Sequence, residues 1–115
     1  MKKELGNRGE EIAARYLKQQ GYRILARNYR SRYGEVDIIC TLEQIVVFVE
    51  VKTRASTSFG SPEESITRNK IQHIRKVALI YLNSYPYPFK EIRFDVIGIL
   101  MEENEPHINH LVAAF

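Results

Sequence analysis

The 115-residue chain is 44% hydrophobic and 27% charged, with a net charge of +3. This is the balance of one soluble domain, so residues 1–115 are treated as a single unit. One cysteine excludes an internal disulfide, and no apolar run reaches the roughly 20 residues that cross a bilayer. Residues 1–8 are charged and lead into no apolar stretch of signal-peptide length, so we expect a cytoplasmic protein without membrane contact.

The first predicted element is a helix over residues 4–20. Ile12 and Tyr16, like Ala13 and Leu17, are four residues apart, which is the spacing of neighbours on a helix face. Gly21 stands where a helix C-cap is expected. Residues 22–29 then read as a strand with interleaved arginines.

Two strands rich in Val and Ile are predicted next, over residues 34–42 and 45–53. The short polar break Glu43-Gln44 between them indicates a hairpin, although this pair is a poor type I′ turn sequence. A Ser/Thr-rich loop follows over residues 55–60.

The second half is predicted to contain one helix and two more strands. Ser61-Pro62-Glu63-Glu64 combines an N-cap serine, a proline at N1 and a glutamate at N3, so a helix should begin there and run to about residues 81–84. Residues 92–101 and 108–114 read as strands around a polar turn at 102–106. The predicted fold class is therefore α/β in the order α-β-β-β-α-β-β, a mixed central sheet flanked by helices.

Acidic residues interrupt the apolar pattern of the two central strands. If the hairpin is symmetric about Glu43-Gln44, Asp37 lies directly across from Glu50, with Cβ atoms about 4.5–5.5 Å apart. A register slip of one residue would instead put Asp37 on the opposite face from Glu50. Two facing carboxylates repel unless a positive charge lies between them, and Mg²⁺ or Mn²⁺ held by these oxygens would supply it.

Lys52 shares a strand face with Glu50, because side chains two residues apart point the same way. Beside a metal it could stabilise charge on a phosphate or activate the attacking water. Phosphodiester hydrolysis fits this arrangement, since a bound metal can polarise the phosphate and lower the pKa of its water. The plainer alternative is a structural salt bridge in which Lys52 pairs with ordinary strand carboxylates.

Glu10 belongs to the stripe of the first helix that carries Ala13, Ala14 and Leu17. A glutamate on a face that should meet the sheet is unusual, because burying an unpaired carboxylate is costly. It could reach the metal site directly or through water, or it could simply be exposed beyond the sheet edge. Asp95 also interrupts a strand but has no facing partner that the sequence names, and His73, His107 and His110 show no metal-ligand spacing.

An aspartate on one strand followed by Glu50-Val51-Lys52 on the next resembles the PD-(D/E)xK signature of restriction-endonuclease-like nucleases. Val36 replaces the proline of that signature. Over essentially the whole chain, the sequence resembles the bacterial YraN-like family, which is similar in fold to archaeal Holliday junction resolvases. The matching segments are Gly6-Asn7-Arg8-Gly9-Glu10, Gly21-Tyr22, Gly34-Glu35-Val36-Asp37-Ile38-Ile39, Val47-Phe48-Val49-Glu50-Val51-Lys52-Thr53-Arg54, Phe59-Gly60-Ser61-Pro62 and Arg93-Phe94-Asp95-Val96-Ile97.

The resemblance implies a restriction-endonuclease-like fold and a role for each matching residue. Asp37 and Glu50 would be metal ligands, Lys52 the catalytic lysine and Glu10 the helical acidic residue, with the Val51 carbonyl as a further ligand. The family is largely uncharacterised, so the resemblance implies a nuclease site without a named substrate.

The distribution of charge suits nucleic acid as the partner, and it suits a solvated basic face equally well. Residues 1–32 carry nine Lys/Arg against three Glu, and the pI is near 9.1. We expect a Mg²⁺-dependent (or Mn²⁺-dependent) endonuclease acting on DNA, including branched or structured DNA; the alternative is a non-catalytic nucleic-acid-binding module. A homodimer paired through residues 108–115 is left open. The expected phosphate contacts are Arg27, Arg30, Arg32, Arg54, Arg68 and Lys70.

Overall fold

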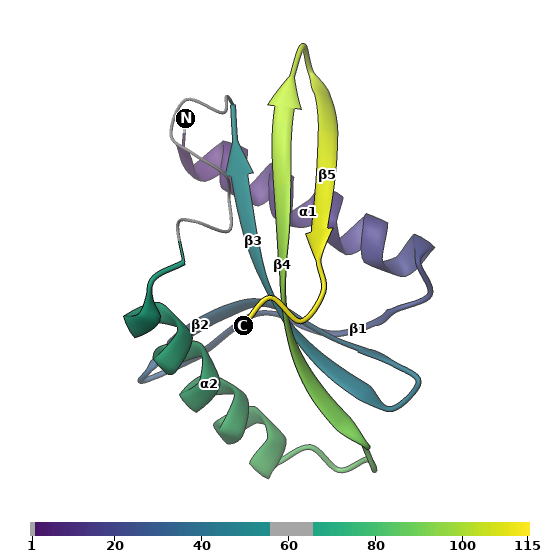
Figure 1. Cartoon of the computed structure of the whole chain (residues 1–115), viewed down its shortest axis with the longest axis vertical. Coiled ribbons are helices and arrows are strands. Elements are labelled where there is room, and N and C mark those ends of the chain that lie inside the picture. The colour runs from purple at the N-terminus through teal and green to yellow at the C-terminus, as the bar shows by residue number, and fades with distance from the viewer. Residues whose placement is uncertain (1, 56–65) are drawn as a thin grey trace.

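The computed structural model describes residues 2–55 and 66–115 and confirms the predicted order of elements (Figure 1). No helix in these two ranges is long and apolar enough to cross a membrane. The elements are α1 (Lys2–Gln19), β1 (Arg23–Ser31), β2 (Gly34–Leu42), β3 (Ile45–Arg54), α2 (Arg68–Asn83), β4 (Glu91–Glu102) and β5 (Glu105–Leu111).

The strands form one mixed sheet in the spatial order β1-β2-β3-β4-β5. Neighbouring strands are antiparallel except β3 and β4, which are parallel and are connected through α2. The two helices cover opposite faces, as Figure 1 shows, so the central strands are buried on both sides. This explains why β3 is apolar at successive positions instead of alternating with polar residues.

Each helix has its own hydrophobic cluster on the sheet. Under α1, Ala13 and Leu17 pack with strand residues that include Val49 and Ile97. Under α2, Ile74 and Val77 pack against Phe48, together with further strand residues. These side chains are all at most 2% exposed, and their burial supplies the main stabilisation of the fold.

The end of α1 confirms the predicted C-cap at Gly21. Gly21 has φ +93°, in the left-handed region that glycine enters without steric cost. The N–H of Tyr22 donates to the Leu17 carbonyl at 2.9 Å, and the N–H of Gly21 donates to the Lys18 carbonyl at 3.1 Å. This Schellman pattern ends the helix and directs the chain into β1.

The β2–β3 hairpin has the predicted register. Leu42 pairs with Ile45 and Ile38 with Val49, so the two-residue turn is Glu43-Gln44. Both turn residues have positive φ (49° and 69°), as a type I′ turn requires, despite a sequence that disfavours it. The hydrophobic pairing of the flanking strands therefore determines the turn, and the alternative slipped register is excluded.

The boundaries in the second half differ from the prediction. The expected helix start at residues 61–64 lies outside the described residues, and the described helix begins at Arg68 with Thr67 as its N-cap. The Thr67 hydroxyl accepts a 3.1 Å hydrogen bond from the N–H of Lys70, so Thr67 is the side-chain cap of the described helix. The β4–β5 turn is only Glu103-Asn104, because strand pairing continues to Glu102 and Glu105.

Two glycines of α1 should respond in opposite ways to alanine. A Cβ on Gly9 would overlap the side chain of Thr53, so this glycine lets α1 approach β3 closely, whereas a Cβ on Gly6 would meet nothing within 4 Å. We expect Gly9→Ala to lower the free energy of unfolding by about 1–3 kcal/mol. Gly6→Ala should raise it by about 0.5–1 kcal/mol through helix propensity. Urea denaturation of both variants checks this, and equal effects would contradict the close contact.

Candidate active site

The hairpin brings Asp37 and Glu50 together. Beyond the pair Ile38–Val49, the next residues outward on the two strands are Asp37 and Glu50. The Asp37 side chain takes over part of the strand pairing, because its Oδ2 accepts a 2.8 Å hydrogen bond from the N–H of Val51. Glu50 is only 5% exposed and Asp37 is partly buried, so the two carboxyls share a poorly solvated place.

The backbone around Asp37 is irregular. Val36 packs in the cluster under α2, whereas Ile38 and Cys40 pack under α1, so the alternation of faces is interrupted at Asp37. On β1, Asn28 has φ +52°. Such departures from regular strand geometry commonly re-aim a side chain at a functional site.

The environment of Asp37 favours its protonated form. Burial, the negative charge of Glu50 and a hydrogen bond shared with Glu50 raise the pKa of Asp37 to about 7. One proton can therefore be held between the two carboxyls near neutral pH. A cation placed there would replace that proton, so the pair behaves as a site for positive charge.

Glu50 has one paired and one unpaired oxygen. Its Oε1 lies 3.1 Å from the Nζ of Lys70, at the start of α2. Its Oε2 is buried without a hydrogen-bond partner among the described residues. An unpaired buried carboxylate oxygen is costly, and a ligand that is absent from the chain itself would satisfy it.

Lys52 is partly buried beside this pair. Burial lowers the pKa of Lys52, and a hydrogen bond with Lys70 and the positive charge of Lys70 lower it further. The negative charges of Glu50 and Asp37 act in the opposite direction. The described ion pair at Glu50 is with Lys70 and not with Lys52, so the simple salt bridge of Lys52 is not observed. Lys70, predicted as a phosphate contact, thus lies inside the carboxylate site.

Glu10 is linked to the site by charge and not by direct contact. Burial raises the pKa of Glu10, as do the charges of Asp37 and Glu35. With its amide nitrogen turned toward the acids, Asn28 donates to Glu10 at 2.9 Å and to Glu35 at 2.8 Å. The partly buried Glu10 is therefore not simply a solvent-exposed residue beyond the sheet edge.

Two protein carboxylates form the core of any metal site here. Within residues 2–55 and 66–115, no group of three His, Cys, Asp or Glu side chains is placed to hold one ion. Mg²⁺ is commonly held by one or two carboxylates with water and phosphate oxygens completing its shell, so this donor set suits it. Val51 contacts the pair through its backbone N–H, which donates to Asp37 Oδ2.

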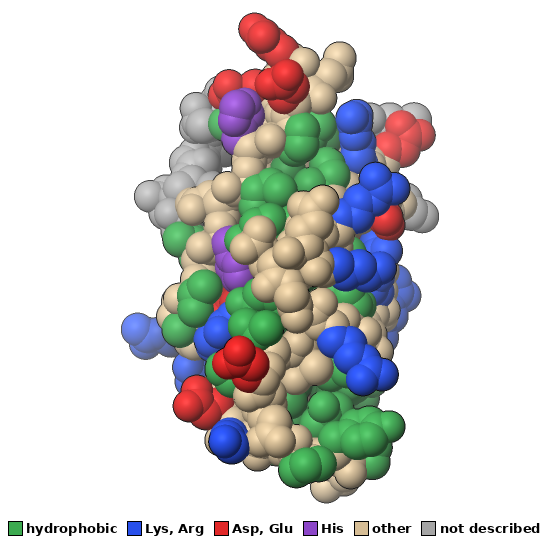
Figure 2. All heavy atoms as spheres, turned by 90° about the vertical axis from the view of Figure 1, so that its right-hand side faces the viewer, with side chains coloured by type: hydrophobic (Ala, Val, Ile, Leu, Met, Phe, Trp, Pro, Cys, Tyr) green, Lys and Arg blue, Asp and Glu red, His purple; other side chains and the backbone are tan. Residues whose placement is uncertain are grey.

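Most of the predicted phosphate-binding arginines contact other groups of the protein, and the charge of Arg27 also acts on Glu10. Arg27 pairs with Glu11 at 2.8 Å and Arg30 with Glu35 at 3.2 Å, while the Arg32 guanidinium lies over the Tyr33 ring. Arg54 donates to the Thr53 carbonyl at 3.1 Å, and Arg68 is exposed in the first turn of α2. In the face shown in Figure 2, many Lys and Arg side chains follow the right-hand edge, whereas acidic side chains lie both at the top and at the lower left.

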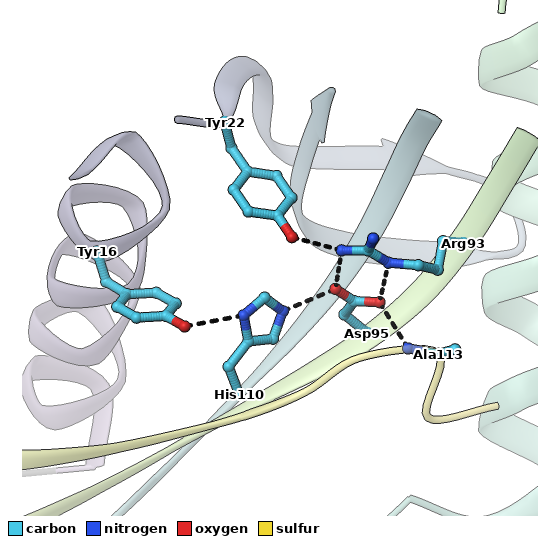
Figure 3. A network of polar contacts seen from close by, with 6 residues as sticks. All are labelled: Tyr16, Tyr22, Arg93, Asp95, His110 and Ala113. Carbon is cyan, nitrogen blue, oxygen red and sulfur yellow. Dashed lines mark hydrogen bonds and ion pairs between the residues drawn. The ribbon is translucent and has the colours of Figure 1, made fainter. Parts of the chain in front are cut away.

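A second polar cluster is centred on Asp95, which is 0% exposed (Figure 3). Arg93 donates to Asp95 through two nitrogens (2.9 and 2.8 Å) and to the Tyr22 hydroxyl at 2.6 Å. His110 Nε2 lies 2.7 Å from Asp95, and its Nδ1 lies 3.0 Å from the Tyr16 hydroxyl.

The sequence offered one signal for this second cluster and missed the rest. Arg93 and Asp95 are two residues apart, the spacing of neighbours on one strand face, so their pairing was readable. Tyr16, Tyr22 and His110 come from α1, its C-terminal turn and β5, and nothing local connects them. The cluster binds remote segments together and leaves no unpaired acid, unlike the pair at Glu50.

Comparison with known proteins identifies a family to which the chain is similar. Residues 9–99 match the model described as "Uncharacterised protein family UPF0102". A UPF0102 protein of Syntrophomonas wolfei is 54% identical over 115 residues, covering both chains completely. One of Nocardia farcinica is 49% identical, covering 99% of this chain and 91% of the relative, and one of Alkaliphilus oremlandii is 47% identical with full coverage of both.

Proposed function

Because the chain belongs to the uncharacterised family UPF0102, its function must be inferred from the site, and we propose that it is a metal-dependent endonuclease acting on DNA. The observation that carries this proposal is the buried pair Asp37–Glu50, in which Glu50 Oε2 has no partner among the described residues. A purely structural pair would gain stability by replacing these acids with apolar residues.

The residues fit a divalent cation such as Mg²⁺ or Mn²⁺. Asp37 and Glu50 offer hard oxygen ligands, and the unpaired Oε2 is the atom that a cation would satisfy. We infer that the Val51 carbonyl and the helical Glu10 complete the protein's contribution, Glu10 through water. When bound, the metal would polarise the phosphate and lower the pKa of a water molecule.

Lys52 suits a catalytic role beside that cation. Because the pKa of Lys52 is lowered, its neutral amine form is easier to reach near physiological pH. A neutral amine can accept a proton from the attacking water. In its charged form the same side chain would stabilise the phosphate in the transition state. The first role depends on the partly buried position of Lys52, because burial is the largest cause of its lowered pKa.

DNA is the proposed substrate because the sequence resembles PD-(D/E)xK nucleases and archaeal junction resolvases. On the same resemblance, we propose that the fold is restriction-endonuclease-like. Arg27, Arg30, Arg32, Arg54 and Arg68 would then contact phosphates, and binding should weaken steeply with salt. A homodimer paired through the edge strand β5 would let two sites act on the two strands of branched DNA.

Cleavage of a labelled panel tests the proposal. Single-stranded, duplex, flap and four-way-junction DNA, and RNA, would be incubated with Mg²⁺, Mn²⁺ or EDTA. The parent should cut with metal, and Asp37→Ala and Lys52→Ala should each lower the rate by at least about 100-fold. Glu91→Ala, which removes an exposed carboxylate at the start of β4, serves as the control and should cut like the parent.

Two results would contradict the nuclease. Binding to DNA without cleavage under every metal condition would favour the non-catalytic nucleic-acid-binding module. Cleavage that persists in both Asp37→Ala and Lys52→Ala would mean that a contaminant or another site is responsible. Binding that does not change between low and high salt would remove the phosphate contacts from the proposal.

A further inference from the structure

The ion pair between Lys70 and Glu50 is unequal in solvent exposure. Their charged atoms lie 3.1 Å apart, yet the side chain of Glu50 is 5% exposed and that of Lys70 is 39% exposed. The carboxylate is held in the sheet, whereas the ammonium is carried on a long side chain open to solvent. Of the two partners, the cation is the one with open solvent to move into.

Lys70 also occupies a position that the helix itself disfavours. The first turn of α2 contains Arg68 and Lys70 and no acidic residue, although a helix N-terminus favours negative charge. The Thr67 cap holds the N–H of Lys70 and so fixes the backbone from which its side chain reaches Glu50. The contact with Glu50 is therefore the local gain that offsets the unfavourable position.

We propose that Lys70 is a displaceable counter-ion, which neutralises Glu50 in the metal-free protein and moves to a substrate phosphate when a divalent cation binds. The inference rests on the proposed function, because it takes the metal as the competing cation. The ammonium of Lys70 lies 3.1 Å from Oε1 of Glu50, and a cation at the unpaired Oε2 would bring a second positive charge to the same carboxylate.

Two consequences follow for the metal-free and metal-bound protein. Without Lys70, the buried carboxylate of Glu50 would lose its ion-pair partner, so the metal-free protein should lose stability. The metal would no longer compete with an ammonium, so its affinity should rise. A lysine that merely contacted DNA would change neither quantity in this way.

Calorimetric titration with Mn²⁺, in the absence of DNA, tests the inference on the parent, Lys70→Gln and Arg68→Gln. We expect Lys70→Gln to bind Mn²⁺ about tenfold tighter, the equivalent of one charge-assisted hydrogen bond. Arg68→Gln removes a charge from the same helical turn, without a described contact to Glu50, and should stay within about twofold of the parent. Lys70→Arg, which keeps a cation, should also remain close to the parent.

Thermal unfolding gives a second measurement on the same proteins. The melting temperature of Lys70→Gln should be below that of the parent without metal and should rise more than that of the parent when Mn²⁺ is added. Equal or weaker Mn²⁺ binding by Lys70→Gln would overturn the inference and leave the metal site standing. An equal gain in Arg68→Gln would overturn it too, and absence of Mn²⁺ binding in every protein would remove the metal from the proposed function itself.

Discussion

The Asp37→Asn protein should be more stable than the parent at pH 8 and should at the same time lose metal-dependent cleavage. In the folded parent, burial and the charge of Glu50 raise the pKa of Asp37 to about 7, well above its value of about 3.9 in an unfolded chain. Between these values the folded state holds a proton that the unfolded state releases. The stability of the parent must therefore fall as the pH rises from about 4 to 7.

Asparagine removes this cost because it carries no charge at any pH. A shift of about three pH units corresponds to about 4 kcal/mol at most, and partial solvent screening reduces the expected gain to about 2 kcal/mol at pH 8. The asparagine amide oxygen can still accept the hydrogen bond from the Val51 N–H. The gain should be largely absent at pH 4, where the parent is protonated as well.

Urea denaturation at pH 4 and pH 8 measures this difference directly. Glu91→Gln, an exposed acid on β4, is the matched control and should show little change at either pH. The same Asp37→Asn protein should cleave more than 100-fold slower, since a neutral amide cannot replace an ionised metal ligand. A substitution that raises the free energy of unfolding and abolishes activity identifies a group kept for function. An Asp37→Asn protein that is less stable than the parent at pH 8 would contradict this interpretation.

Asp95→Ala should lower the free energy of unfolding by about 3–5 kcal/mol, the cost of breaking a buried ion pair from one side. Burial alone would raise the pKa of Asp95, but hydrogen bonds from His110, Arg93 and the Ala113 N–H outweigh it and lower the pKa. Removal of the carboxylate leaves the Arg93 guanidinium, 16% exposed, without the partner that its two nitrogens contact.

The effect of Asp95→Ala should depend on pH with the opposite sign to that of Asp37. A lowered pKa means that the ionised carboxylate stabilises the parent above about pH 4, and that this contribution disappears as the pH falls below. Urea denaturation should therefore show a large gap between parent and variant at pH 7 and a smaller gap near pH 3. Glu105→Ala, an exposed acid on β5, is the control; a loss for Asp95→Ala as small as for this control would contradict the network.

Several features of the fold could be predicted from the sequence because they depend on neighbours along the chain. The order of elements follows from hydrophobic periodicity, and the end of α1 follows from Gly21, whose φ of +93° suits a residue without Cβ. The register of β2 and β3 follows from a two-residue turn between two alternating patterns. That register was enough to place Asp37 beside Glu50, so the centre of the site was predictable.

The sequence predicted less well wherever two signals competed. The helix Arg68–Asn83 is capped by Thr67, which the sequence did not single out, while the start expected at Ser61-Pro62-Glu63-Glu64 lies outside the described residues. Glu43-Gln44 is the clearer case, because strand pairing imposes a turn that its residues disfavour.

Other contacts of the site were decided only by the tertiary structure. Lys70 is 20 residues from Glu50 in sequence and reaches it because α2 packs across the sheet with its first turn at the end of β3. Because α1 packs against the sheet, Asn28 can hydrogen-bond both Glu10 and Glu35. For the same reason His110 contacts both Asp95 and Tyr16. Periodicity and turn chemistry act over a few residues, so the sequence by itself determined the elements and the carboxylate pair. Packing acts between segments far apart in the chain, so only the fold decided which charges surround that pair.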